Sequence, residues 1–177
     1  TYYPSAEIVI NKEIETLYDG VAVPNGVEFP FGLYQKTGEV YDKIANVTAS
    51  VTTAGEGKSY STTMNVKIKD LVDLGLFDES DSVTLYVHEE PLSGTGLDEG
   101  WIPDADYYAV TIGKDGTVDY PGSDEAVTVT NKYEPLSQLS VTKSTDGDLS
   151  KTFDFTIKIG TLNGYPYEYT LSVDGVQ

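Results

Sequence analysis

The chain has 177 residues, of which 29 are Asp or Glu and 11 are Lys or Arg, so its net charge at pH 7 is -18. A field of this sign repels phosphate backbones and anionic lipid headgroups, which argues against binding to nucleic acid, and no apolar stretch is long enough for insertion into a membrane. The absence of Cys and the single His exclude disulfides, thiolate chemistry and zinc sites built from several Cys or His ligands.

Short runs rich in Val, Ile, Thr, Tyr and Phe follow one another along the chain, separated by clusters of Gly, Asp, Asn and Pro. They predict strands near residues 6–13, 27–35, 45–52, 59–68, 82–89, 106–112 and 125–133. The segment 67–77 (KIKDLVDLGLF) has an apolar spacing closer to the helical period, so a short helix or loop is expected there. Seven strands with turns between them predict an all-β, immunoglobulin-like β-sandwich with a short helical turn.

A short polar connector that contains Pro135 separates this region from the rest of the chain. We therefore expect a sandwich over residues 1–135 and a second β module over residues 136–177. The pattern restarts after the connector, because the alternation of IVINK at 8–12 is matched by LSVTK at 139–143. The second module has room for about three strands, too few to cover both faces of a sandwich. It is expected to be incomplete, either truncated or completed by another chain.

Three polar residues continue the apolar stripes of predicted strands. Side chains alternate between the two faces of a strand, so Lys12 shares a face with Ile8 and Ile10. By the same count, Glu89 and Asn131 extend the stripes of the strands near 82–89 and 125–133. Polar groups that point into a core are costly unless they pair with one another, so we expect these three side chains to meet.

These three residue types suggest one reaction. A neutral amine is a nucleophile, a carboxamide is an acyl acceptor, and a carboxylic acid polarises the amide and moves the proton. Burial lowers the pKa of a lysine and raises that of a glutamate, which favours the neutral forms that the reaction needs. Attack of the Lys12 amine on the Asn131 carboxamide would expel ammonia and leave an isopeptide bond. Such a reaction is self-directed and turns over once, so the chain is not expected to be an enzyme.

Three segments carry a family resemblance: IVINK in the first strand, LYVHEEP before the long loop, and AVTVTNKY in the last strand. With them the chain resembles the isopeptide-forming modules of Gram-positive surface proteins, both the major-pilin linkage domain and the CnaB-like domain of collagen adhesins. The resemblance implies that Lys12 reacts with Asn131 and that Glu89 catalyses the reaction. LSVTKSTDG followed by TFDFTIKIG is similar to the opening of a second module and implies Lys143 as its reacting lysine. The choice of Glu89 over Glu90 depends on strand phase, which a one-residue bulge would reverse.

The expected function is that of a structural or adhesive module in a pilus, fibre or stalk on the surface of a Gram-positive bacterium. The expected location is extracellular, at the cell wall or cell surface, and the expected partners are other pilin or surface-protein subunits. The alternative is a secreted adhesin domain that binds a host protein or glycan through residues 91–108, whose aromatics are Trp101, Tyr107 and Tyr108. A glycosidase that uses two carboxylates is the least favoured reading, since no pair of carboxylates stands apart.

No cofactor and no metal site are expected. Acidic clusters, of which residues 78–81 are one example, keep weak calcium binding as an alternative, although none of them has the spacing of an EF-hand loop. Solvated surface charge is the preferred interpretation of these clusters.

Overall fold

The structure is a computed structural model that describes residues 2–77, 79–122, 124–135, 153–162 and 165–173. The chain divides into two compact units, Thr1–Ser137 and Gln138–Gln177, and each is described by itself. We call them unit 1 and unit 2.

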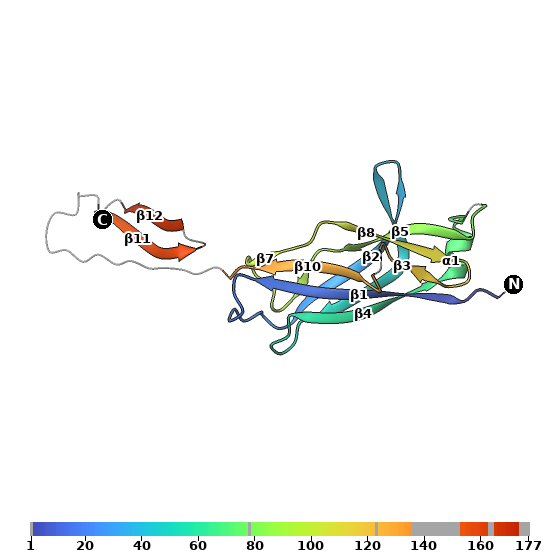
Figure 1. Cartoon of the computed structure of the whole chain (residues 1–177), viewed down its shortest axis with the longest axis horizontal. Coiled ribbons are helices and arrows are strands. Elements are labelled where there is room, and N and C mark those ends of the chain that lie inside the picture. The colour runs from blue at the N-terminus through green and yellow to red at the C-terminus, as the bar shows by residue number, and fades with distance from the viewer. Residues whose placement is uncertain (1, 78, 123, 136–152, 163–164, 174–177) are drawn as a thin grey trace. The chain divides into compact units, whose positions relative to one another are not determined.

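Unit 1 is a sandwich of two β-sheets (Figure 1). The first sheet has the strand order β4 (Ser59–Lys67), β1 (Ser5–Thr16), β10 (Val127–Tyr133) and β7 (Trp101–Ile102). The second has the order β3 (Val40–Thr52), β2 (Val27–Thr37), β5 (Ser82–Glu89), β8 (Tyr107–Gly113) and β9 (Val118–Asp119), and β6 (Ser93–Gly94) pairs with β2. One short helix, α1 (Ile68–Asp73), follows β4. The all-β sandwich expected from the sequence is confirmed, as is the helical turn.

The core lies between the two sheets and is built by the two-residue period of the strands. On β1 the inward positions are Ala6, Ile8, Ile10, Lys12 and Ile14, all of them buried. The second sheet contributes large apolar side chains that are fully buried, among them Phe29, Phe31, Leu33 and Leu85. Burying each such side chain contributes about 1.5–3 kcal/mol, so this apolar layer provides most of the driving force for closing the sandwich.

All seven predicted strands are present, but β3 begins at Val40 instead of near residue 45. Residues 44–47 of β3 lie opposite the single residue Leu33 of β2, because the register shifts between Gly32 and Tyr34. Asn46, within this bulge, has a φ of 63°, a conformation that Asn tolerates better than most residues. The bulge interrupts the alternation on which the prediction of this strand depends.

The strands β6, β7 and β9 were not predicted. Each has two residues, which is too few for a hydrophobic period to be visible in the sequence. Of the three, β7 matters for the site described below, because it pairs with the end of β10 and brings the loop that follows β7 beside that strand.

The first and last long strands of unit 1 are neighbours and run parallel. In the register of β1 and β10, Lys12 lies opposite Val129 and Ile14 lies opposite Asn131. The other edge of β1 pairs with β4 in the antiparallel sense. Lys12 and Asn131 are therefore diagonal neighbours on one face of the sheet, although 119 positions separate them in the sequence.

Unit 2 contains an antiparallel pair of strands, β11 (Phe153–Leu162) and β12 (Tyr165–Val173), whose register shifts between Lys158 and Thr161. The repeat segment LSVTK and Lys143 lie outside the described residues. Within the described part of the chain, no helix is long and apolar enough to span a membrane.

Candidate functional site

Lys12 lies at the centre of the sandwich and is fully buried, with an exposed fraction of 0%. Its Nζ donates hydrogen bonds to Asn131 Oδ1 at 2.8 Å, to the Val129 carbonyl oxygen at 3.1 Å and to the Glu13 carbonyl oxygen at 3.3 Å. The parallel register explains the first two contacts, because it sets Lys12 level with Val129 and one inward position before Asn131. The amine is thus held against the carboxamide that the strand pattern predicts as its partner.

Glu89 reaches the same point from the opposite sheet, where it ends β5. Its Oε1 accepts a hydrogen bond from Asn131 Nδ2 at 2.7 Å, and its Oε2 lies 3.3 Å from Lys12 Nζ. The second contact has the distance of an ion pair but not the geometry of a hydrogen bond, so within the described residues Oε2 has no hydrogen-bond partner. The two carboxyl oxygens therefore face two different nitrogens. Lys12, Glu89 and Asn131 are brought together by the fold.

One aromatic ring contacts this group, and two further rings pack in a chain behind it. Lys12 Nζ lies 4.9 Å from the centroid of the Phe29 ring. The Phe29 and Trp101 rings meet edge to face at a centroid distance of 5.3 Å, and Trp101 packs against Tyr133 at 4.7 Å. Trp101 is only 7% exposed and Phe29 is fully buried, so the ring beside Lys12 is shielded from water. Low water content strengthens each electrostatic interaction inside the site.

Burial changes the ionisation of the two titratable groups. Loss of solvent lowers the pKa of the Lys12 amine below its ordinary value, although the nearby Glu89 carboxylate acts in the opposite direction. Burial likewise raises the pKa of Glu89, against the opposing effects of Lys12 and Asn131. Both shifts favour the uncharged forms. A proton on the carboxyl would also relieve the cost of leaving Oε2 as a buried charged oxygen without a hydrogen bond.

Glu90 is the first residue after β5 and takes no part in this group. Its Oε1 forms an ion pair with Lys43 Nζ at 2.7 Å and accepts a hydrogen bond from the Tyr34 hydroxyl at 2.6 Å. Burial acts to raise the pKa of Glu90, but the bonds from Lys43 and Tyr34 outweigh it and lower the pKa, so this carboxylate stays charged. The strand phase assumed for Glu89 therefore holds in the structure, without a bulge between the two glutamates.

Asp104 belongs to the site and was not found by sequence reasoning. Its main-chain N–H donates a hydrogen bond to Asn131 Oδ1 at 3.0 Å. Its carboxylate accepts hydrogen bonds from the Tyr108 hydroxyl at 2.6 Å, from the Thr130 N–H at 3.2 Å and from the Asp106 N–H at 2.8 Å. Nothing in the sequence sets Asp104 apart from the other acidic residues of segment 91–108, because the two-residue strand β7, which brings it beside β10, leaves no hydrophobic period.

The aromatic residues of segment 91–108 do not form one surface. Trp101 is buried, and the Tyr108 hydroxyl is bound to Asp104. Tyr107 stacks between Tyr41, at a centroid distance of 3.8 Å, and His88, at 3.9 Å, so that both faces of its ring are covered. Of the three rings, Tyr107 therefore has neither face free for stacking against a ligand.

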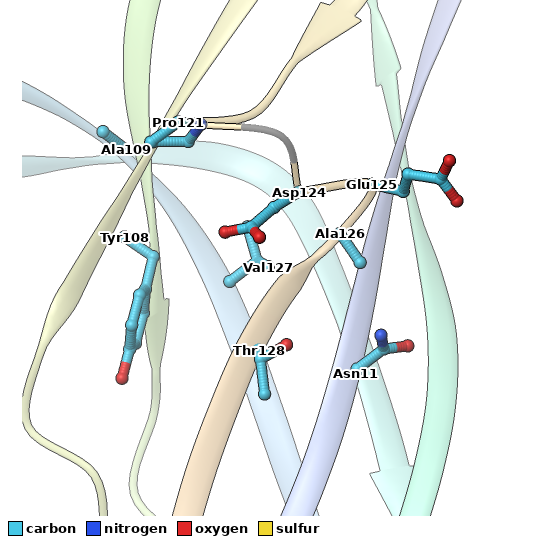
Figure 2. A pocket seen from close by; sticks show the side chains of 9 residues that line it. All are labelled: Asn11, Tyr108, Ala109, Pro121, Asp124, Glu125, Ala126, Val127 and Thr128. Atoms are coloured by element: carbon cyan, nitrogen blue, oxygen red, sulfur yellow. The ribbon is translucent and has the colours of Figure 1, made fainter.

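A surface pocket lies beside the site, between β8 and the start of β10 (Figure 2). Asp124, Glu125 and Thr128 line it, with Tyr108 and Asn11 on opposite sides of β10 in this view. Neither Lys12, Glu89 nor Asn131 lines this pocket. In the ranges that the structure describes, no three His, Asp or Glu side chains converge as they would around a metal ion.

Comparison with solved structures finds similar folds among streptococcal pilins. The major pilin from Streptococcus pyogenes is 15% identical, with a TM-score of 0.48, over 96% of this chain and 72% of the pilin chain. A mutant of that pilin gives 16% identity and a TM-score of 0.49 over the same shares of both chains. The T-13 major pilin protein of Streptococcus pyogenes serotype GAS131465 is 15% identical, with a TM-score of 0.46, over 97% of this chain and 74% of that one. No family model and no curated protein matches the chain.

Proposed function

We propose that unit 1 is a load-bearing structural module of a bacterial surface fibre, pilus or stalk, stabilised by an isopeptide bond that it forms between its own Lys12 and Asn131. One observation carries this proposal: a buried amine, carboxamide and carboxyl group lie in mutual contact, with distances of 2.7–3.3 Å between their polar atoms. A core that served packing alone would fill these positions with apolar side chains, because burying an ion pair seldom gains stability over that choice.

The reaction balances without any added reagent. The Lys12 Nζ lone pair attacks Asn131 Cγ, and the Cγ–Nζ bond forms as the carbonyl electrons move onto Oδ1. Glu89 takes a proton from Nζ and delivers one to Nδ2, since its two oxygens face these two nitrogens. The Cγ–Nδ2 bond then breaks and ammonia leaves. Glu89 is unchanged at the end, so the chain catalyses its own cross-link and has no separate substrate.

The place of the bond suits a module under tension. A force applied to the two ends of unit 1 enters β1 and leaves from β10, which are parallel neighbours. A bond between Lys12 and Asn131 would pass the load directly from one strand to the other, and the strands β2 to β9 would carry none of it. By analogy with a disulfide that closes a loop of this length, the bond would also stabilise the fold by about 5 kcal/mol if chain entropy dominates. Other subunits of the same fibre are the proposed partners, outside the cell.

Single-molecule stretching tests the mechanical half of the proposal. The intact chain is pulled by handles at its two ends, next to the variants Asn131→Ala and Glu90→Ala. Residues 12 and 131 are 119 positions apart, so the loop that the bond locks has an extended length of roughly 400 Å. We expect this length to be released in Asn131→Ala and to stay locked in the parent and in Glu90→Ala. Release of the loop in the parent at ordinary unfolding forces would overturn the proposal.

A further inference from the structure

We propose that Asp104 completes the reaction centre: its main-chain N–H stabilises the negative charge that develops on Asn131 Oδ1, and its carboxylate holds that N–H in place. The inference rests on the cross-linking reaction proposed above and adds a residue to it.

The Asp104 N–H decides which way the Asn131 carboxamide points. A main-chain N–H can only donate, so the atom of Asn131 that it contacts must be the oxygen and not the amide nitrogen. With Oδ1 fixed there at 3.0 Å, Nδ2 is directed to Glu89 Oε1. The nitrogen that must leave is therefore the one beside the proton donor. A flipped carboxamide would present its oxygen to Glu89 and its nitrogen to a group that cannot give up a proton.

The same N–H also supplies the hydrogen bond that Asn131 Oδ1 needs when negative charge develops on it. In the resting site, Asn131 Oδ1 accepts from Lys12 Nζ and from the Asp104 N–H. Lys12 Nζ becomes the nucleophile and cannot keep donating along that line as it approaches Cγ. Glu89 faces the nitrogen, so within the described residues only the Asp104 N–H stays on the oxygen as it becomes an oxyanion. This N–H already lies 3.0 Å from the resting Oδ1, which is the atom on which the charge develops.

Three hydrogen bonds to the Asp104 carboxylate fix the position of this donor. They come from the Tyr108 hydroxyl, the Thr130 N–H and the Asp106 N–H. The bond from Thr130 ties the loop to the residue directly before Asn131, and the Tyr108 bond ties it to β8 in the opposite sheet. A donor held in this way needs no rearrangement when the charge develops, which is the condition for efficient electrostatic catalysis.

If Asp104 acted through its charge alone, removing its carboxylate would have the opposite effect on the reaction rate from the one that the positioning role predicts. A carboxylate near Lys12 favours the protonated amine, which does not attack, so removing the charge would by itself speed the reaction. The positioning role predicts that removing the carboxylate slows it. The direction of the effect therefore separates the two roles.

The test measures the rate of ammonia loss after a short pulse of cell-free synthesis of the full chain, followed by intact mass spectrometry over time. We expect Asp104→Ala to react roughly tenfold slower or more. Asp104→Asn, which keeps an acceptor for the Asp106 N–H, should fall between the parent and Asp104→Ala. Tyr108→Phe keeps the charge of Asp104 and removes one of the hydrogen bonds that hold it, so this variant should also react more slowly.

Tyr107→Phe is the matched control. Tyr107 stacks on Tyr41 and His88, so this variant should react at the parent rate.

The outcomes distinguish this inference from the proposal on which it rests. Ammonia loss in the parent, with Asp104→Ala and Tyr108→Phe both at the parent rate or faster, would overturn the role of Asp104 and leave the cross-link standing. A parent that loses no ammonia would overturn both. Trp101 fluorescence checks that each variant is folded, and Tyr108→Phe decides the matter should Asp104→Ala not fold.

Discussion

Replacing Lys12 by Met and Asn131 by Ala, singly and together, distinguishes a covalent bond from an ordinary hydrogen bond. Each single substitution loses the whole stabilisation that the cross-link provides. The double substitution loses the same stabilisation and not twice that amount. The loop between the two residues spans 119 positions, for which chain entropy gives about 5 kcal/mol. The double variant should therefore be more stable than the sum of the single effects predicts, by about that amount or more. Residues that merely touch give coupling energies of about 0.5–3 kcal/mol.

The assay is equilibrium unfolding in urea of the parent and the three variants, with both the midpoint and the slope recorded. We also expect the parent to have the lowest slope, because a closed loop of this size exposes less surface when the chain unfolds. The same cycle at Lys43 and Glu90, an ion pair of 2.7 Å at the surface, serves as the control and should give a coupling energy below about 1 kcal/mol. A coupling between Lys12 and Asn131 of 3 kcal/mol or less would refute the covalent bond.

Two further predictions concern the chemistry and the packing of the site. The cross-linking rate should follow a bell-shaped pH profile: it falls at low pH as the Lys12 amine is protonated, at a pKa below its ordinary 10.5, and at high pH as Glu89 loses its proton, at a pKa above its ordinary 4.5. Timed mass spectra over a pH series check this, and a rate that climbs steadily to pH 10.5, as for an exposed lysine, would contradict it. Trp101→Ala should lower the free energy of unfolding by about 3–5 kcal/mol in urea titrations, because the ring is buried between Phe29 and Tyr133. A surface role for Trp101 would instead leave stability nearly unchanged.

Much of the fold could be predicted because a half-buried strand has a period of two. The period located the seven long strands of unit 1 and placed Lys12, Glu89 and Asn131 in phase with apolar neighbours, on the faces where the structure has them. The same period also predicted that Glu89, and not Glu90, points into the core. The Glu90 side chain instead pairs with Lys43.

The rest could not be predicted because it depends on pairing between distant segments. The parallel alignment of β1 with β10, which sets Lys12 diagonally beside Asn131, has no local signal in the sequence. Asp104 was missed for the same reason, since it acts through a main-chain N–H whose placement comes from the short strand β7. Main-chain groups are present in every residue, so no pattern of side chains can single one out.

Intact mass spectrometry of the purified chain tests the central claim most directly, with Glu89→Ala and Glu90→Ala measured beside it. We expect the parent and Glu90→Ala to weigh one ammonia less than the sequence requires and Glu89→Ala to have the full mass. Digestion of the parent should then yield a branched peptide that joins Lys12 to Asn131. A parent of full mass, with Lys12 released as a free lysine on digestion, would contradict the account.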